Sequence, residues 1–246
     1  MLYRVLVLVL LGTVATLVPT VICERQDWFQ SYALSRHHKT IPDNIFYLRD
    51  AAREELFRIF RVLHTGMERA GIPYFLIAGS LLGWGRHAKR MIPWDDDIDV
   101  AIVYPIQQHA WFIFKKYVQD RGYRLWVFRE WFKITSPRIP VFNRPAIAVD
   151  IFLYTHHIRT DEMRHASPIA RRMWPNEHFP VNHVFPLQRT TFHGIPTYVP
   201  HRPEKILAQS FGDDYMEVAY VNQIHSPLPF LVIHGGIRKL PSKIRL

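Results

Sequence analysis

The feature that most limits what this chain can fold into is a short acidic run that leads into an apolar segment. Four aspartates lie within five residues, Asp95, Asp96, Asp97 and Asp99, and residues 100–103 are apolar and mostly β-prone. This pattern predicts a strand that enters a hydrophobic core with carboxylates at its beginning. Because side chains alternate between the two faces of a strand, Asp97 and Asp99 point the same way, and Asp95 can join them.

Carboxylates held this close repel each other and raise one another's pKa unless a cation keeps them ionised. Oxygen ligands suit hard divalent ions, so the run predicts a Mg²⁺ or Mn²⁺ site. The alternative is a water-exposed acidic loop, because acidic runs usually lie on the surface. Two observations favour the metal site: apolar residues flank the run, and it follows a Gly79-Ser80 turn at the end of an apolar, strand-like segment, residues 74–78.

A phosphate-binding element is predicted immediately before the acidic strand. Gly79 and Ser80 open a short helix, predicted for residues 81–84, and the free backbone N–H groups at a helix N-terminus suit a phosphate. Arg86 follows, and a guanidinium can hold two phosphate oxygens at once. The other basic side chains of this loop, Lys89 and Arg90, can equally serve to balance the acidic cluster.

A further carboxylate lies in the most apolar stretch of the chain, the buried strand predicted for residues 146–154. Asp150 stands alone among apolar residues there, and a buried charge is costly unless it is paired or bound to a metal. Either it forms a structural salt bridge, or it completes the metal site beside the acidic strand. Asp150 or Asp95 can then accept the proton of an attacking hydroxyl. Lys133 lies in another predicted strand or hairpin, residues 123–135.

Together these segments predict an α/β (α+β) fold, a mixed sheet flanked by helices, with a nucleotidyltransferase-like site. The remaining predicted elements are a helix from residue 43 or 44 to Gly71, a helix at 106–121, a hairpin at 185–200 that turns near His193-Gly194, and a short helix at 203–209. Residues 155–183 carry five histidines without the tight spacing of a zinc site, so we expect these histidines in loops and on the surface.

The N-terminal segment, residues 1–23, is predicted to be a signal peptide or a signal anchor. Residues 2–22 are mostly apolar, and Arg4 supplies a minimal positive start. A stem or linker is expected at 24–42, the catalytic domain at 43–216 and a basic, proline-containing tail at 217–246. This order predicts a type II membrane protein of the Golgi or ER lumen, or alternatively a secreted protein.

The net charge of the 246-residue chain is +10, and its basic residues are spread rather than gathered in a tract. This distribution favours an anionic substrate or a membrane surface over nucleic acid. The chain has one cysteine, Cys23, so an intrachain disulfide framework and a cysteine-rich zinc site are excluded.

Several of these segments resemble the LicD family, which includes fukutin and fukutin-related protein. The resemblance rests on residues 78–83 with Arg86-His87, on the string Ile-Pro-Trp-Asp-Asp-Asp-Ile-Asp-Val at 92–100, and on Val-Asp-Ile-Phe at 149–152. Residues 185–187, 198–200 and 211–216 are similar to the C-terminal motifs of the family.

The resemblance implies a nucleotidyltransferase-like fold. It also implies transfer of a substituted phosphate from a CDP-activated donor to a hydroxyl of a glycan or glycoprotein. By this similarity Asp95, Asp97 and Asp99 are metal ligands, with Asp150 beside them. Gly79, Ser80, Arg86 and Lys133 are the expected contacts to the donor phosphates. The alternatives are a non-catalytic glycan-binding or accessory protein, and a nucleotidyltransferase that uses a nucleoside triphosphate.

Overall fold

The computed structural model describes residues 48, 50–93, 95–138, 140–141, 144–145, 147–221 and 242–245. The predicted signal segment, residues 1–23, and the predicted linker, residues 24–42, lie outside this part of the chain. Within the described residues, no helix is both long and apolar enough to cross a membrane.

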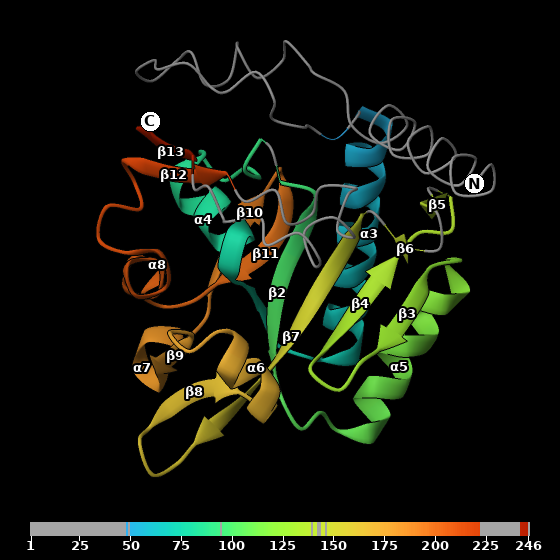
Figure 1. The fold of residues 1–246 in the computed structure, drawn as a ribbon. Coiled ribbons are helices and arrows are strands. Elements are labelled where there is room, and N and C mark those ends of the chain that lie inside the picture. The colour runs from blue at the N-terminus through green and yellow to red at the C-terminus, as the bar shows by residue number, and fades with distance from the viewer. Residues whose placement is uncertain are drawn as a thin grey trace, which may run out of the picture.

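A mixed sheet forms the centre of the molecule (Figure 1). Its main strands run in the order β1 (Tyr74–Leu76), β2 (Asp97–Val103), β7 (Ala148–His157), β4 (Trp131–Thr135) and β3 (Arg124–Val127). β2 and β7 are parallel, whereas the other neighbouring pairs along this path are antiparallel. β8 (Glu162–His165) pairs with the end of β7 and with β9 (His178–Pro180). The predicted class, a mixed sheet flanked by helices, is confirmed.

Two helices cover one face of this sheet. α3 (Asp50–Ala70) places Leu56, Ile59, Phe60, Leu63 and Met67 in the core at helical spacing, and it ends where Gly71 adopts a φ of 65°. α5 (Gln108–Asp120) lies against α3 and β3.

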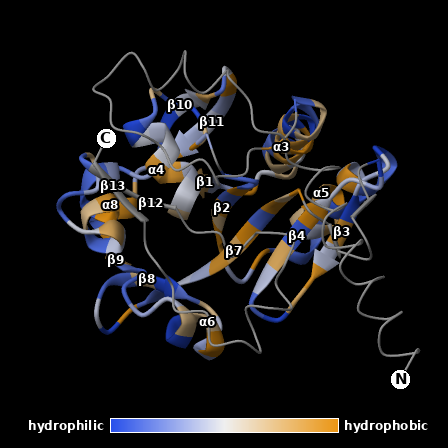
Figure 2. Cartoon of the chain, turned by 45° about the horizontal axis from the view of Figure 1, so that its top comes forward, coloured by the Kyte–Doolittle hydropathy of each residue, from blue (hydrophilic) through white to orange (hydrophobic). Residues whose placement is uncertain are grey.

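Apolar contacts hold these helices to the sheet. Trp111 of α5 lies 4.6 Å from Phe132 of β4, measured between ring centroids. Figure 2 shows apolar residues along β7 and on the sheet-facing side of α3. The layer between this face of the sheet and the two helices therefore belongs to the hydrophobic core of the protein.

Shorter elements gather at the β1 edge and around the other face. They are α4 (Ala78–Arg86), α6 (Pro168–Met173), α7 (Val181–Val184), the hairpin of β10 (Gln188–Phe192) and β11 (Ile195–Val199), and α8 (Pro203–Phe211). β11 lies beside β1, and α8 lies beside α4. The predicted hairpin turn is confirmed, since His193 and Gly194 both have positive φ angles, 49° and 74°.

The structure corrects the prediction for the histidines of residues 155–183. This stretch contains β8, α6, β9 and most of α7, and His165 of β8 is fully buried instead of lying on the surface. A local signal for α6 was present: Ser167 accepts a hydrogen bond from the backbone of Ile169, and Pro168 occupies the first turn.

Two short strand pairs complete the described elements. β5 (Pro140–Val141) pairs with β6 (Arg144–Pro145), and β12 (Val218–Val221) pairs with β13 (Ser242–Arg245). The second pair falls in the predicted tail, for which the sequence indicated no structure.

Candidate active site

The predicted carboxylates meet on one face of the sheet, opposite the face covered by α3 and α5. The strand register places Asp99 of β2 beside Asp150 of β7, and Asp97 precedes Asp99 by two residues on the same side. Oxygen atoms of Asp97, Asp99 and Asp150 lie within 4.8 Å of one another. We call this side of the sheet the functional face.

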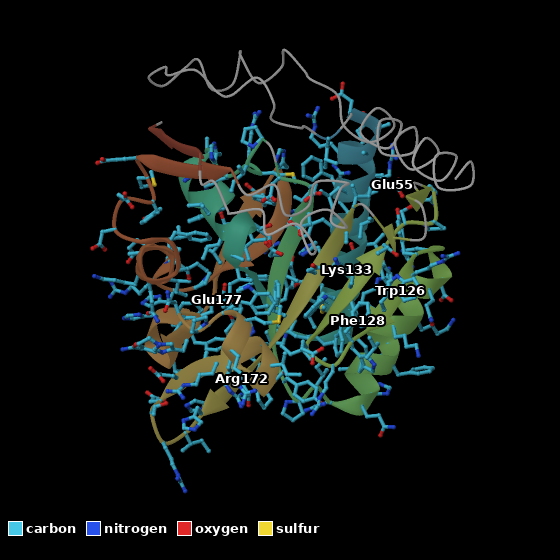
Figure 3. The ribbon with its side chains drawn as sticks, in the orientation of Figure 1. Glu55, Trp126, Phe128, Lys133, Arg172 and Glu177 are labelled. Carbon is cyan, nitrogen blue, oxygen red and sulfur yellow. The ribbon has the colours of Figure 1, made fainter. Side chains whose placement is uncertain are left out.

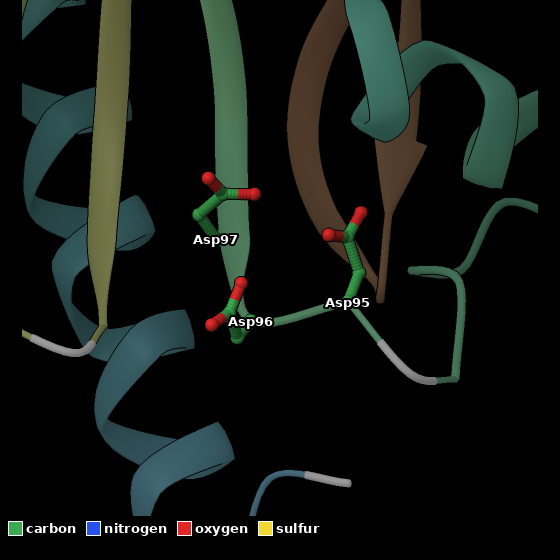
Figure 4. A group of neighbouring side chains, drawn as sticks. All are labelled: Asp95, Asp96 and Asp97. Carbon is green, nitrogen blue, oxygen red and sulfur yellow. The ribbon is translucent and has the colours of Figure 1, made fainter. Parts of the chain in front are cut away.

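A second group of carboxylates adjoins the first at the start of β2. Oxygen atoms of Asp95, Asp96 and Asp97 also lie within 4.8 Å of one another. Figure 4 shows Asp97 on the strand, with Asp95 and Asp96 on the segment that leads into it. Asp97 therefore belongs to both groups, and the structure brings together all four predicted metal ligands.

The start of α4 is fixed against this acidic strand. The Ser80 hydroxyl accepts a hydrogen bond of 2.8 Å from the backbone N–H of Asp99, and the Ile77 N–H donates to the Asp99 carbonyl over 3.2 Å. A Cβ atom on Gly79 would lie only 2.8 Å from Oδ2 of Asp95. Glycine is therefore required here for the carboxylate to approach the helix.

The α4 helix is longer than the predicted residues 81–84, because it begins at Ala78 and ends at Arg86. Its entry is sharp: Ala78 has a φ of 48°, a left-handed conformation uncommon for a residue with a side chain. The backbone N–H groups of the first turn have no carbonyl partner within the helix. These donors and the carboxylates of β2 lie side by side.

Burial and mutual repulsion shape the electrostatics of the acidic cluster. Burial raises the pKa of Asp95 and of Asp99 well above the usual value, and the charge on Asp97 raises both further. Burial raises the pKa of Asp96 in the same way, and Asp97 adds to the effect. A divalent cation would offset this repulsion and keep the carboxylates ionised.

Asp150 has a fixed cation beside it. Lys133 of β4 is the register neighbour of Asp150, and its Nζ lies 3.1 Å from Oδ1 of Asp150. The sequence left open whether Asp150 forms a salt bridge or joins the metal site. In the structure the ion pair with Lys133 forms, and the Asp150 carboxylate also lies beside those of Asp97 and Asp99.

Arg86 lies in the packing between α4 and the segment after α8. Its guanidinium donates to the carbonyl of Tyr215 over 2.9 Å and to Nε2 of His87 over 3.1 Å. Burial lowers the pKa of Arg86 to about 10, and burial followed by the Arg86 charge lowers that of His87 to about 3. The predicted role in phosphate binding stays a prediction.

One residue that was not predicted from the sequence, His193, positions the segment that leads to Asp95. Nε2 of His193 accepts a hydrogen bond of 2.8 Å from the backbone N–H of Met91, and the His193 N–H donates to the carbonyl of Lys89 over 2.9 Å. Burial, followed by the charges of Arg90 and Arg53, lowers the pKa of His193 to about 4, which keeps the ring neutral and able to accept. The His-Gly turn was recognisable, but the role of its imidazole was not.

The chemistry of the donor set fits a hard divalent ion. Within the described residues, the groups able to hold a metal consist of aspartates alone, without histidine or cysteine. Oxygen donors of this kind match Mg²⁺ or Mn²⁺ rather than zinc. Asp95, Asp97, Asp99 and Asp150 are the residues that would hold it.

Comparison with known families identifies the domain. The LicD/FKTN/FKRP family, described as a nucleotidyltransferase domain, matches residues 71–202. The chain belongs to this family. The matched segment runs from just before β1 to just before α8, so it contains every candidate site residue.

The curated relatives are uncharacterised proteins. One from Rickettsia typhi is 29% identical over 148 residues, which cover 60% of this chain and 42% of that protein. One from Rickettsia prowazekii is 25% identical over 178 residues, which cover 72% of this chain and 61% of that protein. The chain therefore spans less than two thirds of the length of either relative.

Among solved structures, the similarity is to an antibiotic-resistance factor, ANT(2'')-Ia. Its crystal structure in complex with adenylyl-2''-tobramycin has a TM-score of 0.38 at 12% identity, covering 60% of this chain and 69% of that one. Its solution structure has a TM-score of 0.39 at 11% identity, covering 67% and 82%. These values are too low to support a conclusion about this chain.

Proposed function

We propose that this chain transfers a substituted phosphate, an alditol phosphate or phosphocholine, from a CDP-activated donor to a hydroxyl group of a glycan. The observation that supports the proposal most directly is the set of aspartates on the functional face, which adjoins the start of α4. Carboxylates can hold a divalent ion, and a helix N-terminus suits phosphate oxygens. The family match is consistent with the same reaction class.

In this reaction the acceptor oxygen forms a bond to the phosphorus that carries the substituent. The phosphoanhydride bond to the nucleotide breaks, and CMP leaves. A bound Mg²⁺ or Mn²⁺ would neutralise phosphate charge as that bond breaks.

The residues of the chain have separate roles in this proposal. Gly79 and Ser80 hold phosphate oxygens through the backbone at the start of α4, and Lys133 adds a positive charge on the other side of the carboxylates. Asp150 or Asp95 takes the proton of the attacking hydroxyl, since each lies within the carboxylate cluster. Asp97 and Asp99 hold the ion.

The apolar segment at residues 2–22 supports a location in the secretory pathway, in the Golgi or ER lumen, with the chain attached to the membrane or secreted. A glycan or glycoprotein acceptor fits that compartment. Nucleic acid is not proposed as a partner, because the positive charge is dispersed along the sequence.

Calorimetric titration of the 246-residue chain with CDP, and separately with CTP, tests the proposal. The expected result is CDP binding that requires Mn²⁺ and is lost in Asp97→Asn. Asp120→Asn is the matched control, because Asp120 lies on α5 and pairs with Lys116 on the exposed surface. If CDP binds equally well without Mn²⁺, or if Asp97→Asn still binds CDP with Mn²⁺, the metal-site assignment is contradicted.

Product analysis separates the proposed reaction from the alternatives. A CDP-donor transferase leaves a substituted phosphate on the acceptor and releases CMP. An enzyme that uses a nucleoside triphosphate would instead leave a nucleotide on the acceptor. A non-catalytic glycan-binding or accessory protein would bind glycan without Mn²⁺-dependent CDP binding.

A further inference from the structure

An exposed tryptophan lies at the end of a row of side chains that crosses the functional face. The register pairs Asp99 with Asp150, Asp150 with Lys133, and Lys133 with Trp126 of β3. Paired residues direct their side chains to the same side of a sheet, so all four share the functional face. With neighbouring strands about 4.8 Å apart, the Cα atoms of Trp126 and Asp150 are roughly 10 Å apart. Figure 3 labels Lys133 and Trp126 on adjacent strands.

The indole of Trp126 is both exposed and held in place. The residue is 42% exposed, although tryptophan is usually well buried. Its Nε1 donates a hydrogen bond of 2.9 Å to Oγ1 of Thr135, a buried residue on the next strand. This bond fixes the orientation of the ring, so that little side-chain entropy is lost when a ligand contacts it.

A second exposed aromatic residue continues this surface. Phe128 follows Trp126 by two residues, is 44% exposed, and has its ring 5.8 Å from that of Trp131. The Phe128 N–H donates to the Trp131 carbonyl, which holds the backbone of Phe128 against the start of β4. Trp126 and Phe128 therefore form an aromatic platform that adjoins Lys133.

The position of the platform indicates which substrate it contacts. Gly79 and Ser80 approach the carboxylates from α4, on the β1 side of β2, whereas Trp126 lies on β3 at the opposite end of the row. In an in-line phosphoryl transfer the attacking and leaving oxygens lie on opposite sides of the phosphorus. If the donor phosphates contact α4, the attacking hydroxyl approaches from the side of Asp150, Lys133 and Trp126.

We propose that the Trp126–Phe128 platform binds the acceptor by stacking against a sugar ring next to the attacking hydroxyl. The faces of a pyranose ring carry C–H groups, which pack favourably against the electron-rich face of an indole. The hydroxyl groups at the ring edge remain free to reach Lys133 and Asp150. This inference rests on the proposed function, because it assigns the acceptor end of the same site.

Saturation-transfer difference NMR on the 246-residue chain tests the platform, with a panel of methyl hexopyranosides and methyl N-acetylhexosaminides as probes. In the unmodified chain we expect ring C–H protons of at least one probe to receive saturation. Trp126→Ala should weaken that binding about five- to tenfold, the range expected for loss of one aromatic contact. Trp126→Phe should restore most of it.

Val127→Ala is the matched control, because Val127 is also exposed but its side chain lies on the other face of the same strand. It should leave sugar binding unchanged. Calorimetry with Mn²⁺ and CDP provides the second readout, and Trp126→Ala should keep that affinity within about twofold.

Three results would overturn the proposal: no probe receives saturation in the unmodified chain, Trp126→Ala binds the probe as well as the unmodified chain does, or it loses CDP instead of sugar. The last result would assign the platform to the donor base. Failure of the proposed function appears separately, as absence of Mn²⁺-dependent CDP binding in the unmodified chain.

Discussion

The two ends of the functional face are built in different ways, although one sheet carries both. At the β2 end, α4 approaches so closely that a Cβ on Gly79 would collide with Asp95, and Ser80 accepts a bond from the backbone of Asp99. At the β3 end, Trp126 remains 42% exposed and is held by one side-chain hydrogen bond.

This difference matches the chemistry that each end is proposed to perform. A closely packed end has few permitted substitutions, which suits groups whose positions must be held to a fraction of an ångström. An exposed end can change without loss of the fold, because surface substitutions usually alter stability little. Substitutions should therefore have the greatest effect near β2 and smaller effects away from it.

The largest expected effect is that of Asp99→Asn. The amide keeps the shape of the carboxylate, and the Ser80 bond to the backbone N–H of residue 99 is retained, but one negative charge of the proposed metal site is lost. Transfer should fall by about 10³-fold or more, because a bound ion contributes several kcal/mol to the transition state. A radiolabelled-donor transfer assay measures the rate, and thermal unfolding checks the fold. A variant with full activity would remove Asp99 from the metal site.

Gly79→Ala should have the next largest effect. The added Cβ would lie 2.8 Å from Oδ2 of Asp95, so the carboxylate must move away from the start of α4. A displacement of this kind should lower activity about 10- to 100-fold and raise the Mn²⁺ concentration needed for half-maximal rate.

Gly122→Ala separates this effect from general strain. Gly122 has a φ of 78° but no atom within 4 Å of an added Cβ, so the substitution should lower stability by about 1 kcal/mol without changing the Mn²⁺ requirement. If both variants shift the Mn²⁺ requirement equally, the contact between Gly79 and Asp95 is not what positions the carboxylate.

Lys133→Met tests the middle of the functional face. Methionine keeps most of the side-chain volume but removes the cation that lies 3.1 Å from Asp150. The carboxylates then depend more on a metal ion for neutralisation, so Mn²⁺ should raise the melting temperature by several degrees more than in the unmodified chain. Differential scanning calorimetry with and without Mn²⁺ measures this. If Mn²⁺ raises the melting temperature equally in both proteins, the Lys133 charge does not neutralise the carboxylates of the proposed metal site.

The acidic half of the site was predictable because local sequence determines it. Strand alternation places Asp97 and Asp99 on one side, and the apolar run around Asp150 indicates a buried strand. Gly79 and Ser80 stand at the strand-helix turn in the sequence itself. The register that brings Asp99 and Asp150 together is not encoded locally, but the presence of carboxylates on two buried strands made their meeting a natural hypothesis.

The remaining features depend on contacts between segments that are distant in the sequence. Residues 155–183 alone do not show that His165 is buried, because its burial also depends on the rings of Phe152 and Tyr154 on β7. Trp126 was visible as part of a predicted hairpin, but its face follows from the pairing of β3 with β4. The hydrogen bond from Met91 to His193 joins residues 102 positions apart.

The smallest expected effect concerns this His193 contact, which lies outside the functional face but holds the segment leading to Asp95. Burial lowers the pKa of His193 to about 4, below its ordinary value of 6.5, so the folded chain binds this proton less readily than the unfolded chain. The free energy of unfolding should therefore fall as the pH drops from about 6.5 toward 4, by about 1–2 kcal/mol at pH 5.

His193→Gln should remove this contribution. The raised pKa values of Asp95 and Asp99 change the stability in the opposite direction as the pH falls. The informative quantity is therefore the difference in the free energy of unfolding between the variant and the unmodified chain. Urea denaturation at pH 5 and pH 7.5 measures the free energy of unfolding of both proteins. Between pH 7.5 and pH 5, the variant should lose less of this free energy than the unmodified chain does. If the stability of the variant has the same pH dependence as that of the unmodified chain, the neutral imidazole does not hold the segment that leads to Asp95. The β2 end of the functional face would then be positioned by α4 alone.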